Sequence, residues 1–267
     1  MKNVVNKFND VTSYIKYLDN GKVQKGFRDS AVAMTESFSG TKSWEAAKDL
    51  LAYGDPEMAK RVNDSGVKKA RAKISRIAKR KTFATAIVGA IPHVPNYITG
   101  TPNSMITTKQ VKVRKRVINL FYNAAFDYSI QTDDVINTAA NVMSAIILIE
   151  ASGVRVNLYA GCISEKRNQL AAAIVKVKDS KDRLDVLKLC YPMINPSWTR
   201  RHFMRYIDVT PKINSGFAYG HGTPKTTKGD KETVLKEAKI SDAIILDYYE
   251  MVGKTTDEII KFIEESK

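Results

Sequence analysis

The chain has 267 residues, 43% of them hydrophobic, and carries 43 Lys and Arg against 28 Asp and Glu, a formal net charge of +15. This length and composition are typical of a globular protein with one large domain or two small ones, and no apolar run is long enough to cross a bilayer. A charge surplus of this size bears on partners rather than on fold, and nucleic acid is the commonest polyanionic partner, before anionic membranes and acidic proteins.

The two cysteines, Cys162 and Cys190, lie in apolar stretches and lack the spacing of metal ligands. Two cysteines cannot stabilise a fold of this size by cross-linking, so we predict two buried free thiols in a reducing compartment. The first residues lack the apolar core of a signal peptide. We therefore expect the protein in the cytosol, or in a particle assembled there.

Residues 1–40 are weakly patterned, and the first clear helix follows Ser43, a good N-cap, and ends at Gly54. Asp55 and Pro56 then begin a second helix, which the spacing of apolar residues extends to Lys81. Its last part, residues 67–81, contains no acidic residue and eight basic ones: Lys68, Lys69, Arg71, Lys73, Arg76, Lys79, Arg80 and Lys81.

This basic segment has two interpretations. A charge run is usually a solvated helix face, with the stems of the lysines and arginines covering apolar surface. Solvated helices, however, commonly mix Glu with Lys four residues apart, and a segment without any acid carries repulsion that a polyanion would relieve. We favour anion binding, supported by a second basic run (Lys112, Arg114, Lys115, Arg116) and by Arg200 and Arg201 next to Trp198.

Residues 90–107 are rich in Pro, Gly and Asn and predict an ordered connector loop. Beyond it we predict alternating strands and helices: a strand at 111–126, a helix from 132 or 133 to 153, antiparallel strands at 154–164 and 169–180, helices within 182–209, a flexible loop at 213–232, a strand at 241–251 and a final helix at 255–267. This order predicts an α/β fold with an open, mostly parallel sheet flanked by helices in residues 109–267, after a mostly helical basic region in residues 1–108.

Polar residues follow the first strand of this α/β part, where open sheets place their ligands. Asn123, Asp127 and Ser129 are therefore a candidate ligand site, although turn and capping chemistry for the next helix explains them more simply. The three histidines, His93, His202 and His221, are far apart, so we predict no metal site. No P-loop and no G-x-S-x-G elbow is present. We expect neither an enzyme nor a cofactor.

The segments "FSGTKSWEAAKDLLAYGDPE" and "VPNYITGTPNSMI" together resemble a family of poorly characterised tailed-bacteriophage proteins. Trp44, Pro95, Tyr97, Gly100, Pro102 and Met105 carry the resemblance, which covers residues 38–210. It implies a Rossmann-like second half, and the order of strands is similar to a von Willebrand factor A-type domain. Such domains bind Mg²⁺ through D-x-S-x-S, and Asn123 and Ala125 stand where that motif has Asp and Ser. A basic protein with a metal-free A-type half also resembles Ro-type RNA-binding proteins.

We therefore predict a phage-encoded, non-enzymatic protein that binds RNA or DNA through backbone and shape contacts in the host cytoplasm or in association with the virion. The alternative is a structural or adaptor protein that acts through a phage or host protein partner. No membrane partner is expected.

Overall fold

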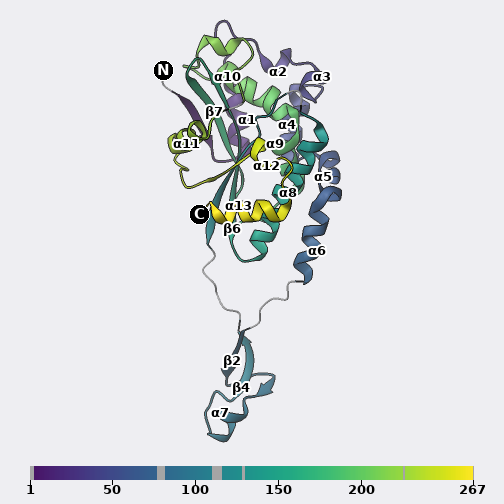
Figure 1. The fold of residues 1–267 in the computed structure, drawn as a ribbon, viewed down its shortest axis with the longest axis vertical. Helices are drawn as coiled ribbons and strands as arrows, with labels where there is room; N and C mark the ends of the chain where they lie inside the picture. Colours follow the sequence, from purple (N-terminus) through teal and green to yellow (C-terminus); the bar gives the residue numbers. More distant parts are fainter. Residues whose placement is uncertain (1–2, 77–81, 110–115, 128–129, 225, 267) are drawn as a thin grey trace.

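The computed structural model describes residues 3–76, 82–109, 116–127, 130–224 and 226–266 (Figure 1). A five-stranded sheet forms its centre, in the spatial order β1 (Val4–Phe8), β7 (Gln169–Lys178), β6 (Arg155–Lys166), β5 (Val117–Asn123) and β8 (Ile244–Asp247). β5 pairs parallel with β6 and β8, β1 pairs parallel with β7, and only β6 and β7 are antiparallel. The predicted α/β fold with a mostly parallel sheet is confirmed.

The turn between β6 and β7 explains their antiparallel pairing. Arg167 and Asn168 both have positive φ, at 50° and 58°, which is the backbone of the two-residue turns that suit the twist of a hairpin. Lys166 and Gln169 are paired across this turn. The predicted antiparallel strands at 154–164 and 169–180 are therefore present, with the first extended by two residues.

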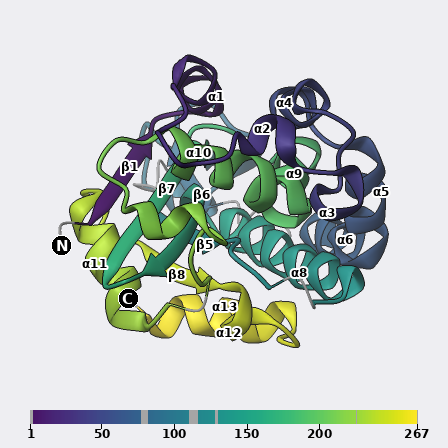
Figure 2. The ribbon, with the colours of Figure 1, turned by 90° about the horizontal axis from the view of Figure 1, so that it is seen from above.

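Helix α8 (Thr132–Ala151) packs on one face of the sheet, and the side chains of β5 show how both faces are filled. Leu120 and Tyr122 belong to the large core under α8, whereas Phe121 lies in a second cluster with Val234 of α11 (Lys228–Glu237). Figure 2 shows α8 and α11 on opposite sides of the sheet. By length and composition α8 could cross a membrane, but 67% of its apolar window is buried in this core.

The N-terminal helices contribute to the same core as the sheet. They are α1 (Val11–Asn20), α2 (Ser30–Ala33), α3 (Glu36–Ser39), α4 (Trp44–Tyr53) and α5 (Pro56–Val62), followed by a π-helical turn (Asn63–Val67) and α6 (Lys68–Arg76). Tyr14, Leu51 and Val62 are buried in the cluster that holds Leu120 and Ile146. Since β1 also joins the sheet, the predicted boundary at residues 108/109 does not separate two hydrophobic cores.

A small antiparallel sheet interrupts this arrangement and lies apart from it in Figure 1. Its strands are β2 (Thr82–Ala86), β3 (Ile91–Pro92) and β4 (Met105–Lys109), in the order β2–β4–β3, with the short helix α7 (Val94–Ile98) between β3 and β4. The prediction of a connector loop at 90–107 was wrong, because both β3 and its partner strand β4 lie largely inside that stretch. Neither has the apolar alternation by which strands are recognised.

The remaining elements complete the large core: α9 (Val186–Ile194), a π-helical segment (Trp198–Phe203), α10 (Met204–Val209), a 3₁₀ turn (Ser215–Ala218), α12 (Tyr248–Met251) and α13 (Thr256–Glu265). The sequence prediction missed β1 and α11. The predicted loop at 213–232 contains the 3₁₀ turn and the first turn of α11, so it is not a loop throughout. Cys162 and Cys190 are buried and free, as predicted.

Candidate nucleic-acid interface and sheet-edge pocket

Helix α6 contains most of the predicted basic segment that the structure describes, from Lys68 to Arg76. Asp55 caps α5 by accepting a hydrogen bond from the backbone N–H of Met58, and Pro56 occupies the first turn. The helical backbone then continues through the π-helical turn into α6, where Val67 and Ala70 are buried against the rest of the protein. Lys68, Lys69, Arg71 and Lys73 are all exposed.

Two of these four cations have acidic partners outside the basic segment. Lys68 pairs with Asp64, one turn earlier, and the Lys73 ammonium lies 3.8 Å from a carboxylate oxygen of Asp257 at the start of α13. Exposed pairs of this kind contribute about 0–1 kcal/mol, so a phosphate can replace the carboxylate at little cost. Lys69 and Arg71 form no ion pair with any residue that the structure describes.

The other predicted cations differ in their exposure. The side chain of Arg76 and all of Lys79, Arg80, Lys81, Lys112, Arg114 and Lys115 lie outside the described residues. Arg116 is exposed directly before β5. Arg200 is partly buried: its guanidinium donates to the carbonyl oxygen of Phe38 at 2.6 Å and lies 5.1 Å from the centre of the Phe38 ring.

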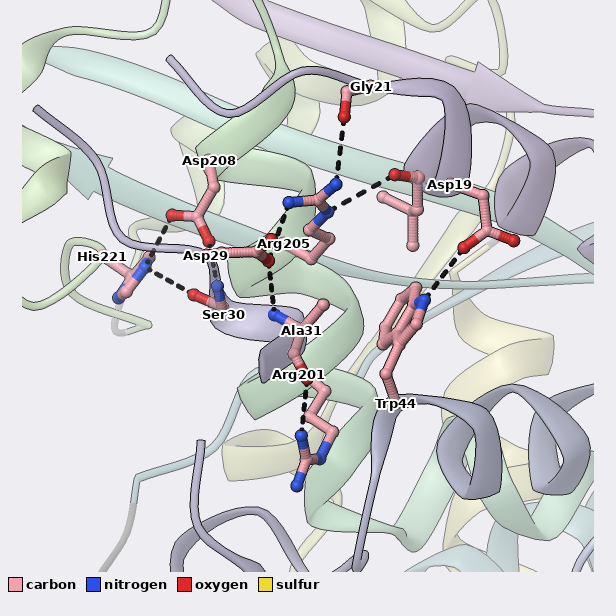
Figure 3. A network of polar contacts seen from close by, with 11 residues as sticks. Asp19, Gly21, Asp29, Ser30, Ala31, Trp44, Arg201, Arg205, Asp208 and His221 are labelled. Atoms are coloured by element: carbon pink, nitrogen blue, oxygen red, sulfur yellow. Dashed lines mark hydrogen bonds and ion pairs between the residues drawn. The ribbon is translucent and has the colours of Figure 1, made fainter. Parts of the chain in front are cut away.

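The prediction that Arg201 contacts nucleic acid was wrong, because this residue is only 1% exposed. Its guanidinium donates to the carbonyl oxygens of Ala31, Met34 and Thr41, each at 2.8 Å. Figure 3 shows the bond to Ala31. Its Nε also bonds two hydroxyl groups, those of Ser39 and Thr41. Arg201 therefore holds residues 31–41 onto the π-helical segment and does not reach a nucleic acid.

The aromatic neighbours of this arginine are equally inaccessible. Trp198 is 2% exposed, so it cannot stack on a base. His202 is fully buried between Trp44 and Trp198, and the Tyr191 hydroxyl lies 3.1 Å from its Nδ1. Burial lowers the pKa of His202 to about 3, which keeps the ring neutral at physiological pH. Trp198 and His202 therefore pack in the interior of the protein.

His221 belongs to a polar cluster that resembles a catalytic triad only in composition. The Ser30 hydroxyl and an Asp208 carboxylate oxygen approach the same ring nitrogen, Nε2, at 3.3 and 3.1 Å (Figure 3). A serine triad needs the serine and the acid on opposite nitrogens of the imidazole. Ser30 is also completely buried, and its backbone N–H donates to Asp208 at 2.8 Å. The cluster fastens the start of α2 to α10.

The carboxyl ends of β5 and β8 meet at the predicted ligand site. Asn123 and Asp247 are paired in register, and the Asn123 amide donates to an Asp247 carboxylate oxygen at 2.8 Å. The Lys231 ammonium lies 2.7 Å from the same oxygen, and all three side chains are buried. The other Asp247 oxygen caps α12 through the N–H of Tyr249. Asn123 and Asp247 are thus committed to each other and to an internal cation.

Lys231 and Asp247 were not predicted as site residues. The strand predicted at 241–251 is shorter in the structure, because β8 ends at Asp247 and Tyr248–Met251 form α12. Asp247 still had a usable signal: it follows an apolar run, and parallel neighbours bring their carboxyl ends to one edge of the sheet. Lys231 had none: it lies on α11, which the sequence pattern did not reveal. Of the predicted residues, Asp127 is exposed and its N–H donates to the Tyr249 hydroxyl at 3.0 Å, whereas Ser129 lies outside the described residues.

A cavity of about 160 Å³ lies beside this edge. Its walls combine Phe126 and Phe203 with polar groups from Asp127, Thr199 and Arg200. Within the described residues no group of three or more His, Cys, Asp or Glu side chains has the geometry of a metal site. The cavity is small, and Ser164, Thr199 and His221 also line it. The hydroxyl groups of Ser164 and Thr199 donate to the backbone carbonyl oxygens of His221 and Ala124.

A family model described as a domain of unknown function (DUF7192) matches residues 1–266. Comparisons with curated proteins and with solved structures found no match. The family match covers both the five-stranded sheet and the small β2–β4–β3 sheet, so both are parts of one family domain. The chain belongs to the DUF7192 family.

Proposed function

We propose that the protein binds nucleic acid, chiefly through phosphate contacts made by α6 and the basic sequence around it. The observation that carries this proposal is the exposure of Lys68, Lys69, Arg71 and Lys73 on a helical segment that is anchored by the buried side chains of Val67 and Ala70. A helix anchored in this way holds its cations at fixed spacing, which lowers the entropy lost on binding a polyanion. The surplus of +15 adds long-range attraction.

Contacts to phosphates rather than to bases fit these residues best. Trp198, the aromatic residue expected to stack on a base, is buried, and no helix-turn-helix or zinc-finger pattern is present in the sequence. Phosphate contacts position a protein without reading sequence. We therefore expect weak sequence preference and a strong dependence of affinity on salt. The resemblance to tailed-phage proteins suggests this role in the cytoplasm of an infected host.

The test is a salt titration of binding to labelled RNA and duplex DNA, with Lys69→Glu/Arg71→Glu as the variant. These two cations form no ion pair among the described residues, so their replacement removes no internal salt bridge there. For DNA, each lost phosphate contact lowers the slope of log K against log salt by about 1, so the double variant should lower it by about 2.

The matched control is Lys16→Glu/Lys25→Glu, which changes the net charge equally at two exposed lysines in and after α1. If α6 is the interface, this control keeps the wild-type slope and loses only a small part of the affinity through the change in net charge. Equal losses for both double variants, or no binding by the wild type at low salt, would refute the proposed interface.

A further inference from the structure

The small sheet with its helix, residues 82–109, is here called the arm module, and its charge distinguishes it from the rest of the chain. Residues 82–108 contain no Asp, Glu, Lys or Arg, although the whole chain carries 43 basic and 28 acidic residues. Basic residues resume at once on both sides in the sequence. An uncharged stretch of this length in so charged a protein requires an explanation other than solubility.

The arm module also lacks a hydrophobic core. No side chain from residue 84 to residue 107 is buried. Large apolar side chains are instead open to solvent, with exposed fractions from 60% to 80%: Ile87, Val88, Ile91, Val94, Tyr97 and Ile98. Val94, Tyr97 and Ile98 share one face of α7, at the spacing that brings helical neighbours together. Such a concentration marks an interaction surface, because monomeric proteins rarely leave one uncovered.

We infer that the arm module binds the arm module of a second copy of this chain. Two copies with a net charge of +15 repel each other, so an uncharged surface is where they can approach with the least repulsion. Residues 82–108 of the arm module meet this condition, and the only charged residue of the module is Lys109 at its end. An apolar surface also binds best to another apolar surface, and the other large exposed hydrophobic residues of the described chain lie outside the arm module, among them Val32, Tyr53 and Tyr219.

The exposed area is sufficient for a stable pair. Each large aliphatic or aromatic side chain exposes on the order of 100 Å² of apolar surface. Six of them on each copy amount to roughly 1,200 Å² when two modules cover each other, which is the lower limit of standard interfaces. A self-complementary patch of this kind is typical of a two-fold dimer.

The sign of the salt dependence separates this partner from others. Salt screens the repulsion between two basic copies, so self-association should strengthen as salt rises. Binding to nucleic acid or to anionic lipid should weaken as salt rises. A titration with salt therefore tests the proposal of nucleic-acid binding and the proposal of self-association independently of each other.

The experiment is sedimentation equilibrium of the full chain, free of nucleic acid, at 50 and 500 mM NaCl. The 29.8 kDa chain should form a dimer whose dissociation constant falls several-fold at the higher salt. Ile98→Lys places a like charge in the interface and should weaken dimerisation at least tenfold. Since Ile98 is 78% exposed, the monomer should fold normally, which circular dichroism checks.

Tyr53→Lys is the matched control: it adds the same charge at a side chain that is 74% exposed on α4, and it should dimerise like the wild type. A wild type that stays monomeric at both salt concentrations, or an Ile98→Lys variant that dimerises normally, would overturn the inference. So would flotation of a monomeric wild type with phosphatidylserine vesicles that Ile98→Lys alters and Tyr53→Lys does not alter in the same way, because that result would assign the arm module to a membrane.

Discussion

Replacing Arg201 with Met tests whether this residue is structural rather than part of a nucleic-acid interface. Methionine retains much of the side-chain volume and removes all the donors. The carbonyl oxygens of Ala31, Met34 and Thr41 then lose a charged donor at 2.8 Å, and the contacts to Ala31 and Thr41 are buried. Each buried polar group left without a partner costs about 1–3 kcal/mol, and relaxation makes such losses less than additive. We expect a destabilisation of about 3–5 kcal/mol.

Urea unfolding followed by circular dichroism measures this loss, and a change of this size corresponds to a fall in Tm of roughly 6–20 °C for a chain of this length. Arg200→Met is the control, because it removes the same charge one residue away at a partly buried side chain, and it should cost about 1 kcal/mol or less. At temperatures where Arg201→Met is still folded, its salt slope for DNA should equal that of the wild type. A variant of unchanged stability with a reduced slope would refute the structural assignment.

Two further predictions concern buried ionisable groups. Lys231→Met should destabilise the protein by about 3–5 kcal/mol, because it leaves the Asp247 carboxylate buried without its cation. Adding Asp247→Asn to this variant should recover most of the lost stability. Urea unfolding measures both changes, and additive losses from the two substitutions would contradict the pairing. His202 has a pKa of about 3 in the folded protein against an ordinary histidine value of 6.5, so the unfolded chain binds more protons between these values. The contribution of His202 to stability is therefore complete above pH 6.5 and is lost as the pH falls toward 3; a His202→Gln variant with the same pH dependence as the wild type would contradict this.

The sequence alone determined those elements whose information is local. The hairpin of β6 and β7, the strand β5 and the helix α8 were all predictable, because a continuous apolar run or a helical apolar stripe identifies a buried element without knowledge of its partner. The buried free cysteines followed in the same way from their apolar surroundings. The exposure of Lys68, Lys69, Arg71 and Lys73 also followed from local periodicity, since Val67 and Ala70 had to face the core.

Tertiary structure decided whatever depends on partners far apart in the chain. β1 is a strand because Val4–Phe8 pairs with β7, more than 160 residues later. Lys231 and Asp247 meet only because α11 covers the sheet beside β8. Arg200 and Arg201 are adjacent in the sequence but differ in burial: Arg200 borders the cavity, whereas Arg201 is buried under residues 31–41. Charge and local pattern are the same for both arginines, and only long-range packing determines which one loses its contact with water.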